Sequence, residues 1–206
     1  MSIDKKKSKD TKTNGFDNNS NSAKNGKTMH LIKSNGTNYV YEWVHSMIFA
    51  IAIVVVLLTF FVRLVDVKGP SMLQTLQNGD KVIITNFMYT PKDGDIVVIS
   101  HGAQYAEPII KRVIATEGQT LDIDFEKQTV TVDGKVIDEP YTQGQTLDKG
   151  GVIPTVIPEG KVFVMGDNRT VSLDSRSTTI GLIDEMDIIG KAQLVVFPFN
   201  DAKTLF

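Results

Sequence analysis

The chain has 206 residues with 41% apolar content, which is enough for one domain of ordinary size plus appendages. It has no cysteine, so disulfides, thiolate metal sites and cysteine nucleophiles are excluded. The formal net charge of −2 argues against a nucleic-acid-binding protein, because such proteins usually carry a basic excess.

The N-terminal segment differs in composition from the rest of the chain. Residues 1–43 contain eight basic and four acidic residues, whereas the remainder contains 14 basic and 20 acidic residues. Residues 1–40 are rich in Lys, Asn, Ser, Gly and Thr and poor in apolar residues. Such a segment buries too little apolar surface to offset its chain entropy, which predicts a disordered tail over residues 1–40.

The longest apolar run, WVHSMIFAIAIVVVLLTFFV, covers residues 43–62 and has no formal charge. As a helix it reaches about 30 Å, the thickness of the hydrocarbon core of a bilayer. A core helix of a soluble protein is rarely this long and apolar on every face. Tyr41 and Trp43 stand at one end, as interfacial aromatic residues do, and Arg63 closes the other. The pattern predicts a transmembrane segment over residues 43–63.

We expect this segment to be an uncleaved signal anchor. The region before it is longer than in cleavable secretory signals, and no small-x-small cleavage site follows Val62. By the positive-inside rule, the lysine-rich tail remains in the cytoplasm and residues 64–206 lie outside the plasma (cytoplasmic) membrane. No second run of spanning length occurs in the sequence, which predicts a single pass.

The part after the anchor is expected to be one all-β domain of coiled antiparallel sheets or a partly open barrel, over residues 64–206. Asp133-Gly134 is a strong hairpin signal within it. Apart from a short turn at 72–77, no helical pattern follows the anchor. Strands are predicted for short β-branched segments bounded by turn residues, at 81–87, 94–100, 108–116, 128–132, 135–138, 161–166 and 192–197.

A serine lies on a tight turn directly after the anchor. Ser71 follows Gly69 and Pro70, and such a turn can expose the hydroxyl and leave backbone N–H groups free for an oxyanion. The segment lacks the G-x-S-x-G pattern of other serine hydrolases. By itself, it also fits an ordinary turn.

A lysine interrupts the apolar strand at 108–116. Strand alternation puts Lys111 on one face with Ile109 and Val113, and Arg112 on the other. Burial on an apolar face lowers the pKa of a lysine, and a neutral amine can accept a proton from a serine hydroxyl. The alternative is an edge-strand lysine that extends to water.

A polar loop, GDNRTVSLDSR, follows an apolar strand at residues 166–176. Asp174 and Arg176 can pair and hold this loop, and Ser172 can form a hydrogen bond with a nearby amine. The alternative is a polar surface loop. Asn168-Arg169-Thr170 also matches a glycosylation sequon, which we treat as incidental.

Together these segments resemble type I signal peptidases, the membrane-anchored serine proteases that remove signal peptides from exported proteins. The resemblance covers roughly residues 43–198, and the single N-terminal anchor is similar to the Gram-positive form. The family's motifs S-M-x-P-T-L, G-D-I-V-V, K-R-x-x-x-x-x-G-D and G-D-N-R-x-x-S-x-D-S-R correspond to residues 71–76, 94–98, 111–119 and 166–176.

The resemblance implies roles for individual residues. Ser71 corresponds to the nucleophile, and Lys111 to the general base that activates it and later protonates the leaving amine. Ser172 corresponds to the serine that orients this lysine. Asp174 and Arg176 correspond to a structural pair near the site.

The implied oxyanion hole uses the backbone N–H of Ser71. Some family members add the hydroxyl of a serine two residues earlier, where this chain has Gly69. Backbone N–H groups are therefore expected to provide more of the oxyanion stabilisation in this chain. The other departures from the family pattern leave the Ser–Lys pair intact and bear on substrate fit and loop geometry. They are Gln74 in place of proline, Gln119 in place of an acid and Thr170-Val171 in place of Asp-Asn.

The implied substrate is an exported preprotein whose signal peptide has small residues at −1 and −3 and adds to a sheet edge as an extended strand. Acyl transfer by serine needs no metal and no cofactor. The expected partners are signal peptides and membrane lipid, not nucleic acid. Apolar side chains near the serine would line shallow pockets, and these are Met72, Leu76, Ile109 and Ile110.

Two other functions remain open: a peptidase that matures a narrower substrate, such as a conjugation or pilus precursor, and an inactive homologue that binds exported peptides. A Ser–His triad would need His101, since His30 lies in the tail and His45 in the anchor. The one acid in the loop of His101 is Glu107, and we favour the Ser–Lys dyad.

Overall fold

Helix α1 (Gly36–Phe61) is the first element of the computed structural model, which describes residues 36–100 and 107–205. Within it, Tyr39–Phe61 is long and apolar enough to cross a membrane, with a mean hydropathy of 2.6 and no burial of its apolar window. Residues 36–40, which the composition assigns to the tail, are helical. The rest of the predicted tail and His101 lie outside the described residues.

The chain divides into one unit of residues 1–44 and another of residues 45–206, with the division inside α1. All strands belong to the second unit. Strand β1 (Val62–Asp66) begins directly after α1, because Val62 pairs with Thr85 in an antiparallel ladder. Thus the first strand starts within residues assigned to the anchor. The wider division into tail, anchor and catalytic domain stays a prediction.

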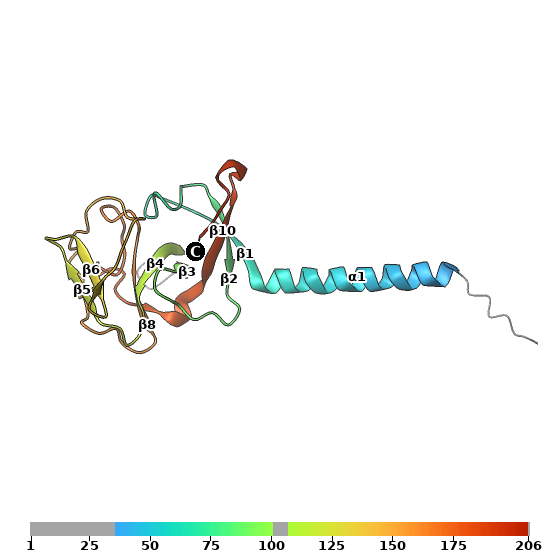
Figure 1. Cartoon of the computed structure of the whole chain (residues 1–206), viewed down its shortest axis with the longest axis horizontal. Coiled ribbons are helices and arrows are strands. Elements are labelled where there is room, and N and C mark those ends of the chain that lie inside the picture. The colour runs from blue at the N-terminus through green and yellow to red at the C-terminus, as the bar shows by residue number, and fades with distance from the viewer. Residues whose placement is uncertain (1–35, 101–106, 206) are drawn as a thin grey trace, which may run out of the picture. The chain divides into compact units, whose positions relative to one another are not determined.

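A large, curled antiparallel sheet contains most of the strands (Figure 1). The strand order is β1-β2-β10-β3-β4-β8-β9, and β11 also pairs with β10. Register shifts interrupt the pairing of β10 with both β2 and β3, and such bulges bend a sheet. The strands after β1 are β2 (Lys81–Thr85), β3 (Ile96–Ile99), β4 (Ile109–Ala115), β8 (Lys161–Met165), β9 (Ile183–Asp184), β10 (Ile188–Phe197) and β11 (Lys203–Thr204).

A smaller sheet comprises β5 (Leu121–Asp124), β6 (Thr129–Val132) and β7 (Lys135–Val136). Asp133 and Gly134 join β6 to β7 with φ of 50° and 74°, the positive values that a tight hairpin turn needs. Two short 3₁₀ helices, η1 (Glu185–Asp187) and η2 (Phe199–Asp201), flank β10. The predicted fold class, antiparallel β-structure preceded by one apolar helix, is confirmed.

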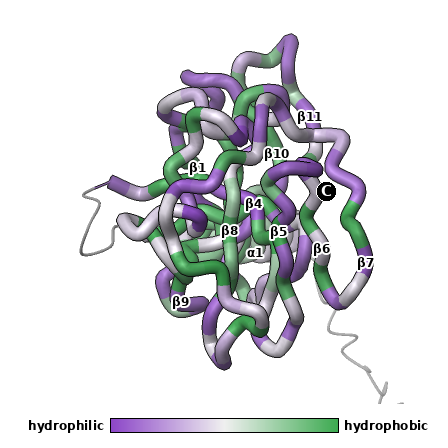
Figure 2. Tube along the Cα trace, turned by 90° about the vertical axis from the view of Figure 1, so that its left-hand side faces the viewer, coloured by the Kyte–Doolittle hydropathy of each residue, from purple (hydrophilic) through white to green (hydrophobic). Residues whose placement is uncertain are grey.

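Hydrophobic residues run along inner strands such as β4 and β8, and hydrophilic residues gather in the surrounding loops (Figure 2). One core cluster packs Val82 and Ile84 of β2 against Ile96 and Val98 of β3. A second cluster joins the smaller sheet to Phe163 and other residues of β4 and β8. The burial of β4 on both faces is what places its lysine in an apolar environment.

Candidate active site

The turn after β1 brings Ser71 to the middle of β4. Lys111 Nζ donates a hydrogen bond to Ser71 Oγ at 3.0 Å, and another to the carbonyl oxygen of Ile110 at 3.1 Å. Lys111 is 3% exposed, whereas Ser71 is half-buried. A hydroxyl and an amine at this distance form the arrangement in which a base activates a serine nucleophile.

The Lys111 amine titrates close to neutral pH. Burial lowers its pKa from 10.5 to about 8, while the carboxylates of Asp174 and Asp167 act in the opposite direction. An exposed lysine is almost wholly protonated at this pH. Lys111 therefore has an appreciable neutral fraction that can accept a proton from Ser71.

Strand order explains the burial of Lys111. Strand β4 lies between β3 and β8, and Lys111 pairs with Val97 of β3. Because β4 is an inner strand, the alternative of an edge-strand lysine extending to water is wrong. Every residue of β4 after Ile109 is buried.

Gly166, at the end of β8, permits a close approach between the serine turn and the polar loop (residues 166–176). A Cβ atom at this position would lie 2.2 Å from Ser172 Oγ and 2.5 Å from the Ser71 carbonyl oxygen. The N–H of Asn168 also donates to that carbonyl at 3.0 Å. The sequence pattern assigns Gly166 no role, although a glycine next to a strand is one signal of close backbone approach.

The Ser172 hydroxyl is completely buried and, within the described part of the chain, makes no hydrogen bond of ordinary geometry, although it lies near enough to the Asp174 carboxylate to help lower the pKa of that group. A buried polar group without a partner costs stability, so its presence calls for an explanation. The hydroxyl packs beside Gly166 and the Ser71 turn. The hydrogen bonds of Lys111 in this structure go to Ser71 and to the Ile110 carbonyl oxygen, so the predicted contact between Ser172 and Lys111 stays a prediction.

A buried ion pair holds the polar loop. Arg176 donates to both carboxylate oxygens of Asp174, at 2.9 and 2.8 Å, and both residues are 0% exposed. The N–H of Gly166 donates to the same carboxylate at 3.0 Å. Burial acts to raise the pKa of Asp174, but the Arg176 guanidinium, together with the Gly166 N–H and the Ser172 hydroxyl, holds this pKa below its ordinary value. The structure thus brings together Ser71 and the predicted structural pair through Gly166.

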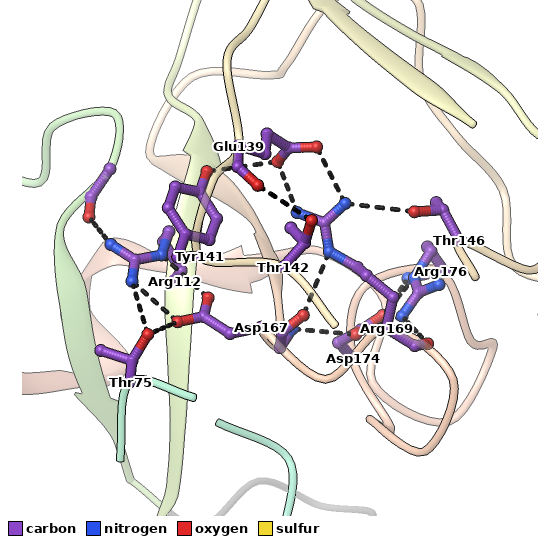
Figure 3. A network of polar contacts seen from close by, with 12 residues as sticks. Thr75, Arg112, Glu139, Tyr141, Thr142, Thr146, Asp167, Arg169, Asp174 and Arg176 are labelled. Carbon is purple, nitrogen blue, oxygen red and sulfur yellow. Dashed lines mark hydrogen bonds and ion pairs between the residues drawn. The ribbon is translucent and has the colours of Figure 1, made fainter. Parts of the chain in front are cut away.

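Two other buried arginines, to which the sequence pattern assigns no role, connect the polar loop to neighbouring segments (Figure 3). Arg112 donates to both carboxylate oxygens of Asp167, at 2.9 and 2.7 Å, and lies over the Tyr141 ring with 3.8 Å to its centroid. Arg169 pairs with Glu139. Pairing of this kind is what allows charges to remain in a protein interior.

The turn that carries Ser71 contains two residues with positive φ. Gly69 has φ +82°, and its N–H donates to Asn78 Oδ1 at 2.9 Å, so that N–H is not free for an oxyanion. Among the described residues, no backbone acceptor is hydrogen-bonded to the N–H of Ser71. Gln74 has φ +79°, which the family's proline could not adopt because its ring holds φ near −65°.

The Ser–Lys pair opens into a groove with a volume of about 350 Å³. Ile109 and Ile110 line this groove, as expected of pocket residues. Met72 and Leu76 do not: they are 1% and 0% exposed and belong to a core cluster. Their side chains point from the serine turn into the interior, because a turn with this many apolar residues must bury some of them.

The residues of this chain match those of known peptidases over most of its length. A family model described as signal peptidase, peptidase S26, matches residues 40–197. Signal peptidase I of Bacillus licheniformis is 34% identical over 181 residues, which cover 82% of this chain and 95% of that protein. Signal peptidase IB of Staphylococcus aureus (strain COL) is 35% identical over 187 residues, covering 81% and 94% respectively.

A crystal structure of a signal peptidase I from Enterococcus faecalis V583 is 24% identical, with a TM-score of 0.41, and covers 50% of this chain and 97% of that one. The family match covers both Ser71 and Lys111 and extends through the polar loop. By this match and the identity to its relatives, the chain belongs to the signal peptidase (peptidase S26) family and is a serine endopeptidase.

Proposed function

We propose that this enzyme cleaves N-terminal signal peptides from exported preproteins, after small residues at −1 and −3, with Ser71 as nucleophile and Lys111 as general base. The observation that carries the proposal is the 3.0 Å contact between Ser71 Oγ and the buried Lys111 Nζ. The family match supports the reaction class. The presence of a serine and a lysine on this fold would not support the proposal without this contact, since a serine without a base is a weak nucleophile.

In the first half of the reaction, neutral Lys111 accepts the Ser71 proton while Ser71 Oγ bonds to the carbonyl carbon of the −1 residue. Negative charge moves to the carbonyl oxygen, to which the N–H of Ser71 donates. The Lys111 ammonium then protonates the leaving amine as the peptide bond breaks. The mature protein departs, and the signal peptide remains bound to Ser71 as an ester.

In the second half, Lys111 takes a proton from water, whose oxygen attacks the ester carbon. The bond to Ser71 Oγ breaks, and Lys111 returns its proton to that oxygen. During both halves the buried Ser172 hydroxyl is a partner for the lysine, which changes between amine and ammonium. The burial of this hydroxyl beside Gly166, against which the Ser71 carbonyl oxygen also lies, supports this positioning role.

The groove supports binding of an extended peptide. Strand β1 is the terminal strand of the large sheet, so its outer edge has no neighbour in the described sheet. Leu64, Val65 and Asp66 of this strand line the groove together with Ser71. An extended peptide can therefore pair its main chain with β1 and bring a carbonyl to the serine, the mode of recognition called β-strand addition.

The first test is cleavage of a secretory precursor by the full-length, detergent-solubilised enzyme, with sequencing of the new N-terminus. We expect cut sites after small residues at −1 and −3. Ser71→Ala and Lys111→Ala should each lower kcat/KM by several orders of magnitude, because each removes one partner of proton transfer. The acid limb of kcat/KM should rise with pH up to about pH 8, as Lys111 loses its proton.

His101→Ala is the matched control, because it removes the one other side chain that could serve as a base for a triad. It should retain most activity. An active Lys111→Ala enzyme, or an acid limb near the ordinary histidine pKa that disappears in His101→Ala, would contradict the Ser–Lys assignment. Absence of cleavage of every precursor by the wild-type enzyme would favour a binding protein instead.

We further propose that Tyr39–Phe61 anchors the enzyme in the plasma membrane, with the lysine-rich N-terminus in the cytoplasm and the catalytic domain outside. Protease added to spheroplasts should then digest the chain beyond about residue 62 and leave the N-terminal segment protected. Permeabilised cells, in which both sides are accessible, provide the control. Protection of the C-terminal region in intact spheroplasts would overturn this orientation.

A further inference from the structure

Besides the Ser–Lys pair, the groove contains an exposed ion pair. Lys68 Nζ and Glu107 Oε2 lie 2.8 Å apart, and both residues line the groove together with Ser71. Their side chains are 74% and 68% exposed, so the contact lies at the rim and not on the floor. Pairing raises the pKa of Lys68 and lowers that of Glu107, so both groups stay charged at the pH of the reaction.

The ion pair joins the two walls of the groove. Lys68 comes shortly after β1, which provides one wall, and Glu107 comes shortly before β4, which provides the other. Asp66, the other acidic residue of the lining, is already paired with Lys81 at 2.6 Å. A peptide that lies between β1 and β4 must therefore pass Lys68 and Glu107, which are close to the nucleophile.

Strand geometry indicates which substrate residue meets this ion pair. Successive side chains of an extended peptide point to opposite faces. If the −1 and −3 side chains enter the apolar pockets beside Ile109 and Ile110, the −2 side chain points away from the floor and toward the rim. The two charges of the pair are available there, because an exposed ion pair is weak and opens readily.

We propose that Lys68 and Glu107 are specificity-determining residues that contact the −2 side chain of the substrate, and that as a pair they make this position indifferent to charge. The inference rests on the proposed function. With both residues present, the attraction of a charged −2 side chain to one of them is offset by its repulsion from the other. With one of them neutralised, the remaining charge selects −2 residues of the opposite sign.

The test uses three peptides that differ only at −2, with Ala-Gln-Ala, Ala-Lys-Ala or Ala-Glu-Ala before the scissile bond. The full-length wild-type enzyme should cleave all three with similar kcat/KM. Lys68→Gln should prefer the Lys peptide over the neutral Gln peptide by roughly five-fold, as expected for one charge contact of about 4 Å in water, and should cleave the Glu peptide more slowly than the Gln peptide. Glu107→Gln should show the reverse preference. The double variant should again be indifferent, and high salt should reduce both preferences.

Lys127→Gln is the matched control, because it breaks an exposed Lys127–Asp124 ion pair of 2.6 Å on the smaller sheet, outside the groove lining. With this variant, the ratios of kcat/KM among the three peptides should be the same as with the wild-type enzyme. Peptides with the charge moved to +2 should show no preference in either groove variant. All exchanges are at exposed positions, where folding is little affected.

The outcomes separate the two proposals. If the wild-type enzyme cleaves the Ala-Gln-Ala peptide but all variants keep wild-type proportions, the role of the ion pair is overturned and the proposed function stands. A preference that appears at +2 and not at −2 would equally overturn it. If the wild-type enzyme cleaves none of the peptides and no precursor, both proposals fail.

Discussion

We expect Lys111→Met to abolish cleavage and, at the same time, to raise the free energy of unfolding at pH 7 by about 3 kcal/mol. Burial lowers the pKa of Lys111 in the folded protein from 10.5 to about 8. Methionine has a similar length and no charge to desolvate. The enzyme thus keeps a destabilising residue in its core, which is understandable if the neutral amine is needed for the reaction.

The direction in which the free energy of unfolding changes with pH follows from the number of protons bound in the folded and unfolded states. Between about pH 8 and 10.5, the unfolded chain holds a proton on this lysine that the folded protein has lost, so wild-type stability rises with pH. Below about pH 8 the full cost of the buried lysine remains. The advantage of Lys111→Met should therefore be complete at pH 7 and disappear near pH 10.5.

Urea unfolding of the full-length protein in detergent, at pH 7 and pH 10.5, measures this difference. Lys135→Met, at an exposed position on β7, is the control and should change stability little at either pH. Equal stability of wild type and Lys111→Met at pH 7 would show that the amine is not desolvated.

Lys111→Arg should also be inactive, because a guanidinium stays protonated and cannot accept the serine proton.

The second large effect is expected for Gly166→Ala, which should lower kcat/KM by at least about 100-fold, since displacements of about 1 Å at a reacting group have effects of this size. The added Cβ would meet Ser172 Oγ at 2.2 Å and the Ser71 carbonyl oxygen at 2.5 Å. Both contacts are too short, so either both groups or residue 166 itself must move, and all of them belong to the site. Overpacking should also reduce the free energy of unfolding by about 1–3 kcal/mol. Peptide cleavage and urea unfolding measure the two effects separately.

Gly190→Ala is the matched control for this prediction. Its Cβ would meet the Thr85 carbonyl oxygen at 2.7 Å, a comparable clash between β10 and β2. It should lose stability but keep near-wild-type kcat/KM in the folded fraction. Similar kcat/KM losses in both variants would indicate a general effect of overpacking, and full activity of Gly166→Ala would show that the close approach is not needed.

Local sequence pattern was sufficient for most of the elements, whereas strands β1, β5, β9 and β11 lie outside the predicted segments. The apolar run before Arg63 predicts α1, and short β-branched segments between turn residues predict most strands, because side-chain periodicity reflects burial in a strand or helix. Asp133-Gly134 predicts the β6–β7 hairpin, because its conformation depends on two residues alone. The motifs also singled out Ser71 and Lys111 as the proposed catalytic pair, and the structure places Lys111 Nζ 3.0 Å from Ser71 Oγ.

The contacts between segments that are distant in sequence were decided only by the tertiary structure. Whether Lys111 is buried depends on β8 packing beside β4, and strand order cannot be obtained from the periodicity of one strand. Met72 and Leu76 could be pocket or core residues by sequence, and their direction is fixed by how the turn packs on the sheet. The role of Gly166 follows from its contact with Ser71, 95 positions away in the printed sequence, because a missing side chain leaves no local pattern and is explained only by what lies against it.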